Sequence, residues 1–301
     1  MTVTAKMVKE LRDKTGAGMM DCKKALVACE GDMGEAIDWL REKGIAKAAK
    51  KAGRIAAEGL CEVVIEGNTA FLFELNSETD FVAKNDQFLN LLSKLGKILI
   101  EAKPADITEA LSIEKEGKTV EAHVVEASAK IGEKLTLRRV TKVTKTDTQV
   151  FGTYKHMGGK IAVITVLEGD NPVAAKDIAM HVAAINPRYI DETGVNAADV
   201  EHERTMFTKE FENELANETN EKAKAAKMKR IPQIVEGKVN KWLKESCLVE
   251  QPFVKNPDVT VLQYTESNNS KVVQFIRFEV GEGIEKKVDN FAEEVRAQVR
   301  A

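Results

Sequence analysis

Two β-rich runs followed by an amphipathic helix form the clearest pattern along the chain. Residues 60–65 and 69–75 are rich in β-forming side chains and are separated by Glu-Gly-Asn, which favours a tight turn. Apolar residues then recur at helical spacing over residues 86–101, which predicts a helix with one apolar face. The stretch at residues 74–86 therefore joins a β-hairpin to a helix.

A further helix and strand complete a first subdomain, predicted to span residues 55–147. Apolar side chains on one face predict a helix over residues 119–132, and alternation predicts a strand over residues 134–143. A hairpin, two helices and a strand are typical of a small α+β unit.

A second subdomain repeats this arrangement but is interrupted. Most of it lies in residues 148–195, and residues 246–282 complete it. Its predicted elements are strands at 150–155, 160–167 and 272–280 and a helix at 173–184. The predicted fold class is therefore α+β with small antiparallel sheets.

Two further helical segments flank this completion. Residues 196–245 are charged and carry apolar residues at helical spacing in both halves, which predicts an antiparallel helical hairpin inserted into the second subdomain. Residues 283–301 have Val288 and Phe291 on one side of a last amphipathic pattern, which predicts a carboxy-terminal helix.

Three short helical patterns occupy residues 1–54. A Gly-Ala-Gly run ends the first, Gly31 ends the second, and Asp32 is placed to cap a third that Gly44 is expected to end. Residues 47–54 are rich in Ala and Lys and are expected to form a helical linker. The region holds twelve basic and eight acidic residues, a net charge of +4. This surface either suits an acidic partner or is a solvated face.

Composition argues against direct binding of nucleic acid. The chain has 301 residues, and its charged residues nearly balance at a net charge of −3. This balance gives no overall field that attracts nucleic acid, and an aromatic content of 5% provides no stacking platform for single strands.

The cysteines indicate neither a metal site nor a disulfide. Cys22, Cys29, Cys61 and Cys247 form no C-x-x-C pair and have no histidine at metal-ligand spacing, so we expect reduced thiols. The amino terminus has no apolar leader, and no apolar run reaches about 18 residues. We therefore expect a cytoplasmic protein without a membrane contact.

No catalytic constellation is present in the sequence. The glycine-containing runs lack the spacing of phosphate-binding loops, and no histidine belongs to a nucleophile motif. We therefore expect a protein that is not an enzyme and has no cofactor. His181 is expected to face the sheet or a subunit contact, whereas His156 lies in a glycine-containing turn where exposure is expected.

The loop before the helix at residues 86–101 carries Phe81 beside Asp80, and two interpretations of Phe81 are open. Phe81 precedes Phe88 by seven residues and so could pack on the same apolar stripe. Alternatively, it is an aromatic anchor exposed on a loop, where binding residues concentrate.

Three runs resemble signatures of the elongation factor Ts family, the nucleotide-exchange factors of the translational GTPase elongation factor Tu. Residues 79–85 (TDFVAKN) resemble the family's loop signature, residues 15–26 (TGAGMMDCKKAL) its amino-terminal signature, and residues 274–285 (QFIRFEVGEGIE) its carboxy-terminal one. Their order is the expected one, and together they span nearly the whole chain.

The resemblance implies elongation factor Tu as the partner and GDP–GTP exchange, through disturbance of a magnesium–phosphate site, as the activity. It implies a ubiquitin-associated-like domain at residues 1–54 and a coiled-coil hairpin that can form a homodimer. The implied Mg-dislocation loop is Thr79, Asp80, Phe81 and Val82, and the other implied contacts are Met19, Met20, His156, Met157 and Gly158. The alternative is a ubiquitin-associated-type adaptor or RNA-associated chaperone without exchange activity.

Overall fold

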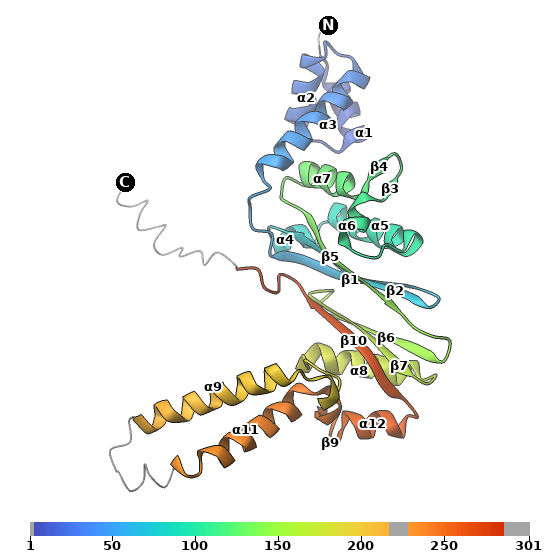
Figure 1. Ribbon diagram of the computed structural model, residues 1–301. Helices are drawn as coiled ribbons and strands as arrows, with labels where there is room; N and C mark the ends of the chain where they lie inside the picture. The colour runs from blue at the N-terminus through green and yellow to red at the C-terminus, as the bar shows by residue number, and fades with distance from the viewer. Residues whose placement is uncertain (1–2, 217–227, 286–301) are drawn as a thin grey trace. The chain divides into compact units, whose positions relative to one another are not determined.

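The computed structural model describes residues 3–216 and 228–285, which fold into two units (Figure 1). Unit 1 contains the described residues up to Thr144, Lys155–Ala162 and those from Phe278 onward; unit 2 contains Lys145–Tyr154 and Val163–Arg277. The predicted carboxy-terminal helix and the tip of the predicted hairpin fall outside the described residues. Within those residues, no helix is long and apolar enough to cross a membrane.

Three helices form the amino-terminal part of unit 1, as predicted. They are α1 (Ala5–Thr15), α2 (Met19–Ala28) and α3 (Met33–Lys50). Gly16 ends α1 in the left-handed conformation, and the Asp32 carboxylate accepts a hydrogen bond of 2.8 Å from the Glu35 backbone N–H at the start of α3. Leu11 and Leu26 are buried in the small core that these helices share.

The prediction that Gly44 ends the third helix is wrong. The helix α3 continues through Gly44 to Lys50, so part of the predicted linker is its last turn. A Cβ atom on Gly44 would lie 3.1 Å from the Cβ atom of Ala129 on α7 (Val120–Ile131). Glycine at this position therefore allows close approach between two helices.

The core of unit 1 is a three-stranded antiparallel sheet with helices packed on it. The strands are β1 (Glu58–Glu66), β2 (Thr69–Ser77) and β5 (Thr136–Thr144), in the order β1-β2-β5. The predicted helix at residues 86–101 is α5 (Asp86–Ala102), whose buried residues include Phe88, Leu95 and Leu99. They pack with Phe71 and Phe73 of the central strand β2 in one apolar core.

Sequence patterns missed the short elements of unit 1. These are α4 (Asp80–Ala83), α6 (Ile107–Ser112), β3 (Glu114–Lys115) and β4 (Lys118–Thr119). None is longer than six residues, too short for a periodic pattern to identify. The predicted second helix and last strand are confirmed as α7 and β5.

The second sheet has the predicted split. It contains β6 (Gln149–His156), β7 (Ile161–Glu168) and β10 (Lys271–Glu279), in the order β10-β7-β6. In unit 2, the helix α8 (Pro172–Ile185) lies so close to β6 that a Cβ atom on Gly152 would meet the Ala175 carbonyl carbon at 2.1 Å.

The remainder of unit 2 contains the helical hairpin and a short-element segment. The hairpin helices α9 (Ala197–Ala216) and α11 (Ile231–Ser246) bury Leu215, Val235 and Val239. Ion pairs join Arg204 to Glu236 at 3.2 Å and Lys238 to Glu210 at 2.8 Å. The unpredicted short elements are η1 (Glu192–Gly194), η2 (Leu248–Glu250), β8 (Pro252–Phe253), β9 (Asn256–Thr260) and α12 (Val261–Ser267).

Candidate functional site

Phe81 has the most exposed large apolar side chain in the described part of the chain, at 80%. It lies on α4, a single turn whose N-cap is Thr79. Val82 packs against the core of unit 1 and Ala83 is buried in it, so the turn is fixed from its inner side and Phe81 points outward. The packing interpretation, in which Phe81 joins Phe88 on the α5 stripe, is therefore wrong. The binding role of Phe81 stays a prediction.

Asp80 provides a negative charge next to this exposed ring. Its carboxylate lies 2.9 Å from the ammonium group of Lys84, one turn further along the chain. This hydrogen bond and the positive charge of Lys84 lower the pKa of Asp80 below its ordinary value of 3.8. Asp80 is therefore ionised at neutral pH and can accept hydrogen bonds or attract a cation.

The β6–β7 turn presents a second exposed apolar side chain. Met157 is 74% exposed, and Met157, Gly158 and Gly159 all have positive φ angles, of 48°, 69° and 113°. Gly159 is required by close approach, because a Cβ atom there would meet the Cys61 carbonyl oxygen at 2.7 Å. The turn therefore holds His156 and Met157 outward on a backbone that contacts β1.

The β6–β7 turn and the Phe81 loop lie at the same end of the unit 1 sheet, as an ion pair and the β1–β2 strand register show. Lys160, just after the turn, pairs with Glu58 of β1 at 2.6 Å. Glu58 is the register partner of Ser77, the last residue of β2, from which the Phe81 loop leaves. The charge of Lys160 also helps to lower the pKa of Asp80. Two of the three predicted contact regions thus lie together.

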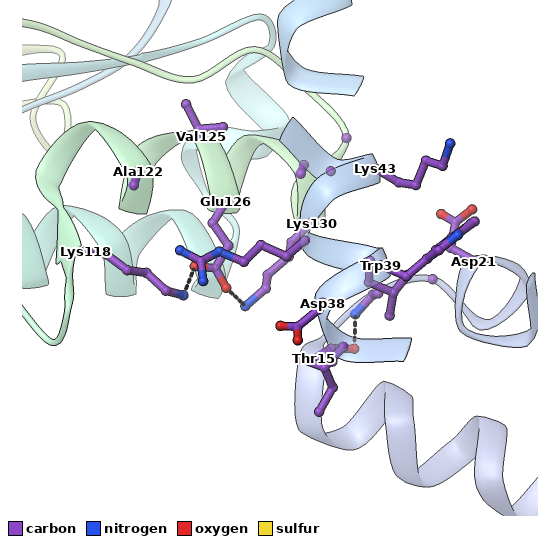
Figure 2. Close-up of a pocket in the computed structure, with 18 of the residues that line it drawn as sticks. Thr15, Asp21, Asp38, Trp39, Lys43, Lys118, Ala122, Val125, Glu126 and Lys130 are labelled. Atoms are coloured by element: carbon purple, nitrogen blue, oxygen red, sulfur yellow. Dashed lines mark hydrogen bonds and ion pairs between the residues drawn. The ribbon is translucent and has the colours of Figure 1, made fainter. Parts of the chain in front are cut away.

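The third predicted region, Met19 and Met20, lies in the first turn of α2 and is exposed. It lies next to a cavity of about 830 Å³ in unit 1, lined by Gly18 and Asp21 of the helical domain and by α3 and α7 (Figure 2). None of the predicted site residues lines this cavity.

Two lysines flank a glutamate on the α7 side of the cavity. Figure 2 shows Lys118 and Lys130 directed at the carboxylate of Glu126, with distances of 2.6 and 3.1 Å. Burial opposes ionisation of Glu126, but the hydrogen bonds and charges of both lysines prevail and lower its pKa to about 2. Glu126 is therefore part of an ion-pair cluster that links β4 to α7.

No group of three or more His, Cys, Asp and Glu side chains in the described ranges could hold a metal ion. His181, expected to face the sheet or a subunit contact, is buried, and its ring nitrogens contact Gln251 and Val254 in the segment around β8. The four cysteines are free, and Cys61 is buried with its pKa raised to about 12, chiefly by burial.

Sequence reasoning did not single out two glutamates of unit 1, one on the strand that leads into the Phe81 loop and one hydrogen-bonded to Thr79 of that loop. Glu74 is fully buried in β2, and Glu133, after α7, accepts hydrogen bonds from Thr79. A charged residue within the otherwise apolar run of β2 was a usable signal for Glu74. For Glu133 no local signal exists, because its partner is 54 residues away.

Comparison with known families identifies a matching family model. The family model described as Elongation factor TS matches residues 78–282, well over half of the chain. The matched range contains the Phe81 loop, the β6–β7 turn and the helical hairpin; it excludes Met19 and Met20.

Proposed function

Because the chain belongs to the elongation factor Ts family, whose members act in translation elongation, we propose that it binds elongation factor Tu and promotes exchange of GDP for GTP. The observation that carries the proposal is the exposed Phe81 ring beside the ionised Asp80 on a turn anchored in the core. Such a pair suits insertion into a partner protein. The work it does is binding rather than bond chemistry.

An exchange factor accelerates GDP release by binding the nucleotide-free GTPase more tightly than the GDP-bound form. A shift of about four decades requires a difference of about 5.5 kcal/mol between the two complexes. Full burial of one phenylalanine provides only about 1.5–3 kcal/mol. Phe81 therefore needs a second contribution.

Disturbance of the partner's Mg²⁺ provides that contribution in our proposal. Mg²⁺ holds nucleotide phosphates in a strict octahedral geometry and tolerates little displacement of its ligands. Phe81 wedges between partner side chains near the ion, and the carboxylate of Asp80 reorients the groups around it. Thr79 and Val82 complete the loop as its cap and its core contact.

Release of mantGDP from elongation factor Tu, measured by stopped flow, tests the proposal. The double variant Asp80→Ala with Phe81→Ala should fold and still associate with the GTPase, yet stimulate release far less, with the largest defect at high Mg²⁺. Lys94→Ala, at another exposed ion pair of unit 1, is the matched control. Wild-type activity of the double variant at high Mg²⁺ would contradict the proposed disturbance of Mg²⁺ by Asp80 and Phe81.

The β6–β7 turn forms a separate contact in this proposal. His156, Met157 and Gly158 are exposed, and Gly158, which has no Cβ atom, allows the backbone to approach a partner closely. His156→Ala should raise the Kd of the complex without changing the unfolding midpoint. An unchanged Kd would remove this turn from the interface.

In this proposal Met19 and Met20 form a third contact with the partner. The Met19→Ala, Met20→Ala double variant should weaken the complex, since both side chains are exposed. The helical hairpin forms a homodimer contact in the same proposal. If the wild-type chain binds no elongation factor Tu and leaves mantGDP release unchanged, the alternative of an adaptor or RNA-associated chaperone without exchange activity is favoured.

A further inference from the structure

The Phe81 loop is fastened at its base to the segment that follows α7. The Thr79 backbone N–H donates to one carboxylate oxygen of Glu133 at 2.9 Å, and the Thr79 hydroxyl donates to the other at 2.7 Å. In return, the Lys134 backbone N–H donates to the Glu78 carboxylate at 2.6 Å. Two neighbouring residues on each side thus exchange three hydrogen bonds.

The backbone of Glu133 is itself held by the end of α7 and by a side-chain hydrogen bond. Gly132 ends α7 in the left-handed conformation, which sets the direction of the chain. The buried Ser128 hydroxyl donates to the Glu133 backbone carbonyl at 2.5 Å. The carboxylate of Glu133 is therefore presented from a fixed backbone.

Phe81 depends on this fixed base because its own side chain has little packing. Its ring is 80% exposed, so its direction is set by the backbone of α4. The Thr79 hydroxyl makes two hydrogen bonds. As the cap of α4 it accepts from the Val82 backbone N–H at 3.4 Å, and it donates to the Glu133 carboxylate. An acceptor at Glu133 therefore fixes the rotamer of the capping residue two positions before Phe81.

We propose that Glu133 is a positioning residue for nucleotide exchange, which sets the direction of the Phe81 ring through Thr79. Glu133 touches neither nucleotide nor partner in this role. Hydrogen bonds to a charged acceptor are among the stronger ones in proteins, so their loss loosens the loop. Glu133 is half-buried after the end of α7 and is not part of the apolar core of unit 1, so its truncation should leave that core intact. The inference rests on the proposed exchange function.

A graded series of variants tests it in the full-length chain with elongation factor Tu. Glu133→Ala removes both acceptor oxygens, whereas Glu133→Gln keeps one. At saturating concentrations, the rate of mantGDP release should fall about tenfold or more for Glu133→Ala and by less for Glu133→Gln, with the Kd for the GDP-bound GTPase unchanged. Glu114→Ala, at an exposed glutamate of β3 in the same unit, is the control.

A double-mutant cycle separates positioning from general damage. If Glu133 acts through Phe81, Glu133→Ala should have almost no further effect on release in a Phe81→Ala background. Equal losses in both backgrounds, or a wild-type rate for Glu133→Ala, would overturn the inference. A raised Kd with an unchanged saturating rate would also overturn it.

A measurement on the isolated chain tests the positioning role of Glu133 separately from the proposed exchange function. With 4-fluorophenylalanine at position 81, Glu133→Ala should narrow the fluorine resonance and move it toward the value of the free amino acid, and Glu114→Ala should leave it unchanged. If the wild type does not stimulate release, the proposed function fails. An unchanged resonance in Glu133→Ala would overturn the positioning role whatever the exchange activity.

Discussion

The buried carboxylate of Glu74 accepts a hydrogen bond of 2.8 Å from the backbone N–H of Gly281, 207 residues further along the chain. Arg138 and Arg139 also contact this carboxylate, at 3.2 and 2.5 Å. Gly281 has a φ angle of 74°, and a Cβ atom there would lie 2.2 Å from the Ala57 carbonyl oxygen. Glu74 thus fixes the chain after β10 against the strand that leads into the Phe81 loop.

Glu74→Gln should destabilise the protein by about 3 kcal/mol. The neutral amide removes the buried negative charge that Arg138 and Arg139 contact in the wild type. Urea unfolding followed by circular dichroism measures this loss. Glu66→Gln, at an exposed glutamate at the end of β1, is the control and should change stability little. A Glu74→Gln midpoint equal to that of Glu66→Gln would contradict the prediction.

Acid should weaken the same contact. Burial opposes ionisation of Glu74, but the Gly281 N–H, Asn76 and Arg139 outweigh it and lower its pKa below the ordinary 4.5. The unfolded chain therefore takes up the proton first as the pH falls. The stabilisation is fully present above about pH 4.5 and is lost as the pH falls through the lower pKa of the folded state. Glu74→Gln should lose less stability than the wild type below this pH.

His181 should make unit 2 sensitive to milder acid. Its Nδ1 atom accepts from the Val254 backbone N–H at 3.1 Å, so the neutral ring carries its proton on Nε2, which donates to Gln251 at 2.9 Å. Burial lowers the pKa of His181 below 6.5, against the opposing hydrogen bond with Gln251. The unfolded chain binds the proton first, so stability is lost as the pH falls below about 6.5.

The measurement uses urea midpoints at pH 7.5 and 5.5 in a Trp39→Phe background, in which Trp242 is the remaining tryptophan and reports on unit 2. The wild type and His202→Gln, a control at an exposed histidine of α9, should lose more stability between these pH values than His181→Gln. Equal losses in all three proteins would show that His181 titrates alike in the folded and unfolded states.

Phe81 and Phe88 should differ sharply in their contribution to stability. Phe88 is fully buried, so Phe88→Ala should cost about 3–5 kcal/mol. Phe81 is mostly exposed, so Phe81→Ala should change stability by less than about 0.5 kcal/mol. Urea unfolding of both variants checks the difference. A large cost for Phe81→Ala would return Phe81 to the core.

Periodicity in the sequence identified the long elements correctly, because their packing follows a repeating pattern. The stripe of Phe88, Leu95 and Leu99 and the strands of both sheets are of this kind. Gly44 shows the limit: helices often end at a glycine, but this glycine lies within α3, where it allows close approach to Ala129 on α7. The hydrogen bonds between Thr79 and Glu133 were likewise not predictable from local sequence, since only the fold brings the two residues together.

Gly152 and Gly237 form another matched pair. A Cβ atom on Gly152 would overlap the Ala175 backbone at 2.1 Å, so Gly152→Ala should force β6 and α8 apart and cost roughly 1–3 kcal/mol or more. Gly237 lies within α11 with open space around it, so Gly237→Ala should stabilise by about 0.5–1 kcal/mol. Opposite shifts of the thermal midpoint are expected, and shifts of the same sign would contradict the close approach of β6 and α8.

Replacement of residues 198–241 by a short Gly/Ser linker should leave the rest of the chain folded. The helices α9 and α11 pack on each other, with Leu215, Val235 and Val239 buried and an ion pair between Lys238 and Glu210. Because the hairpin leaves and returns within unit 2, its removal costs few contacts elsewhere. Under the proposed function, the shortened chain should therefore stimulate mantGDP release at the same rate as the full chain. Sedimentation should show loss of any homodimer. The full-length variant Lys238→Glu, which breaks the ion pair with Glu210, is the control. If this control is active but the deletion variant folds and has no exchange activity, the hairpin is part of the exchange site.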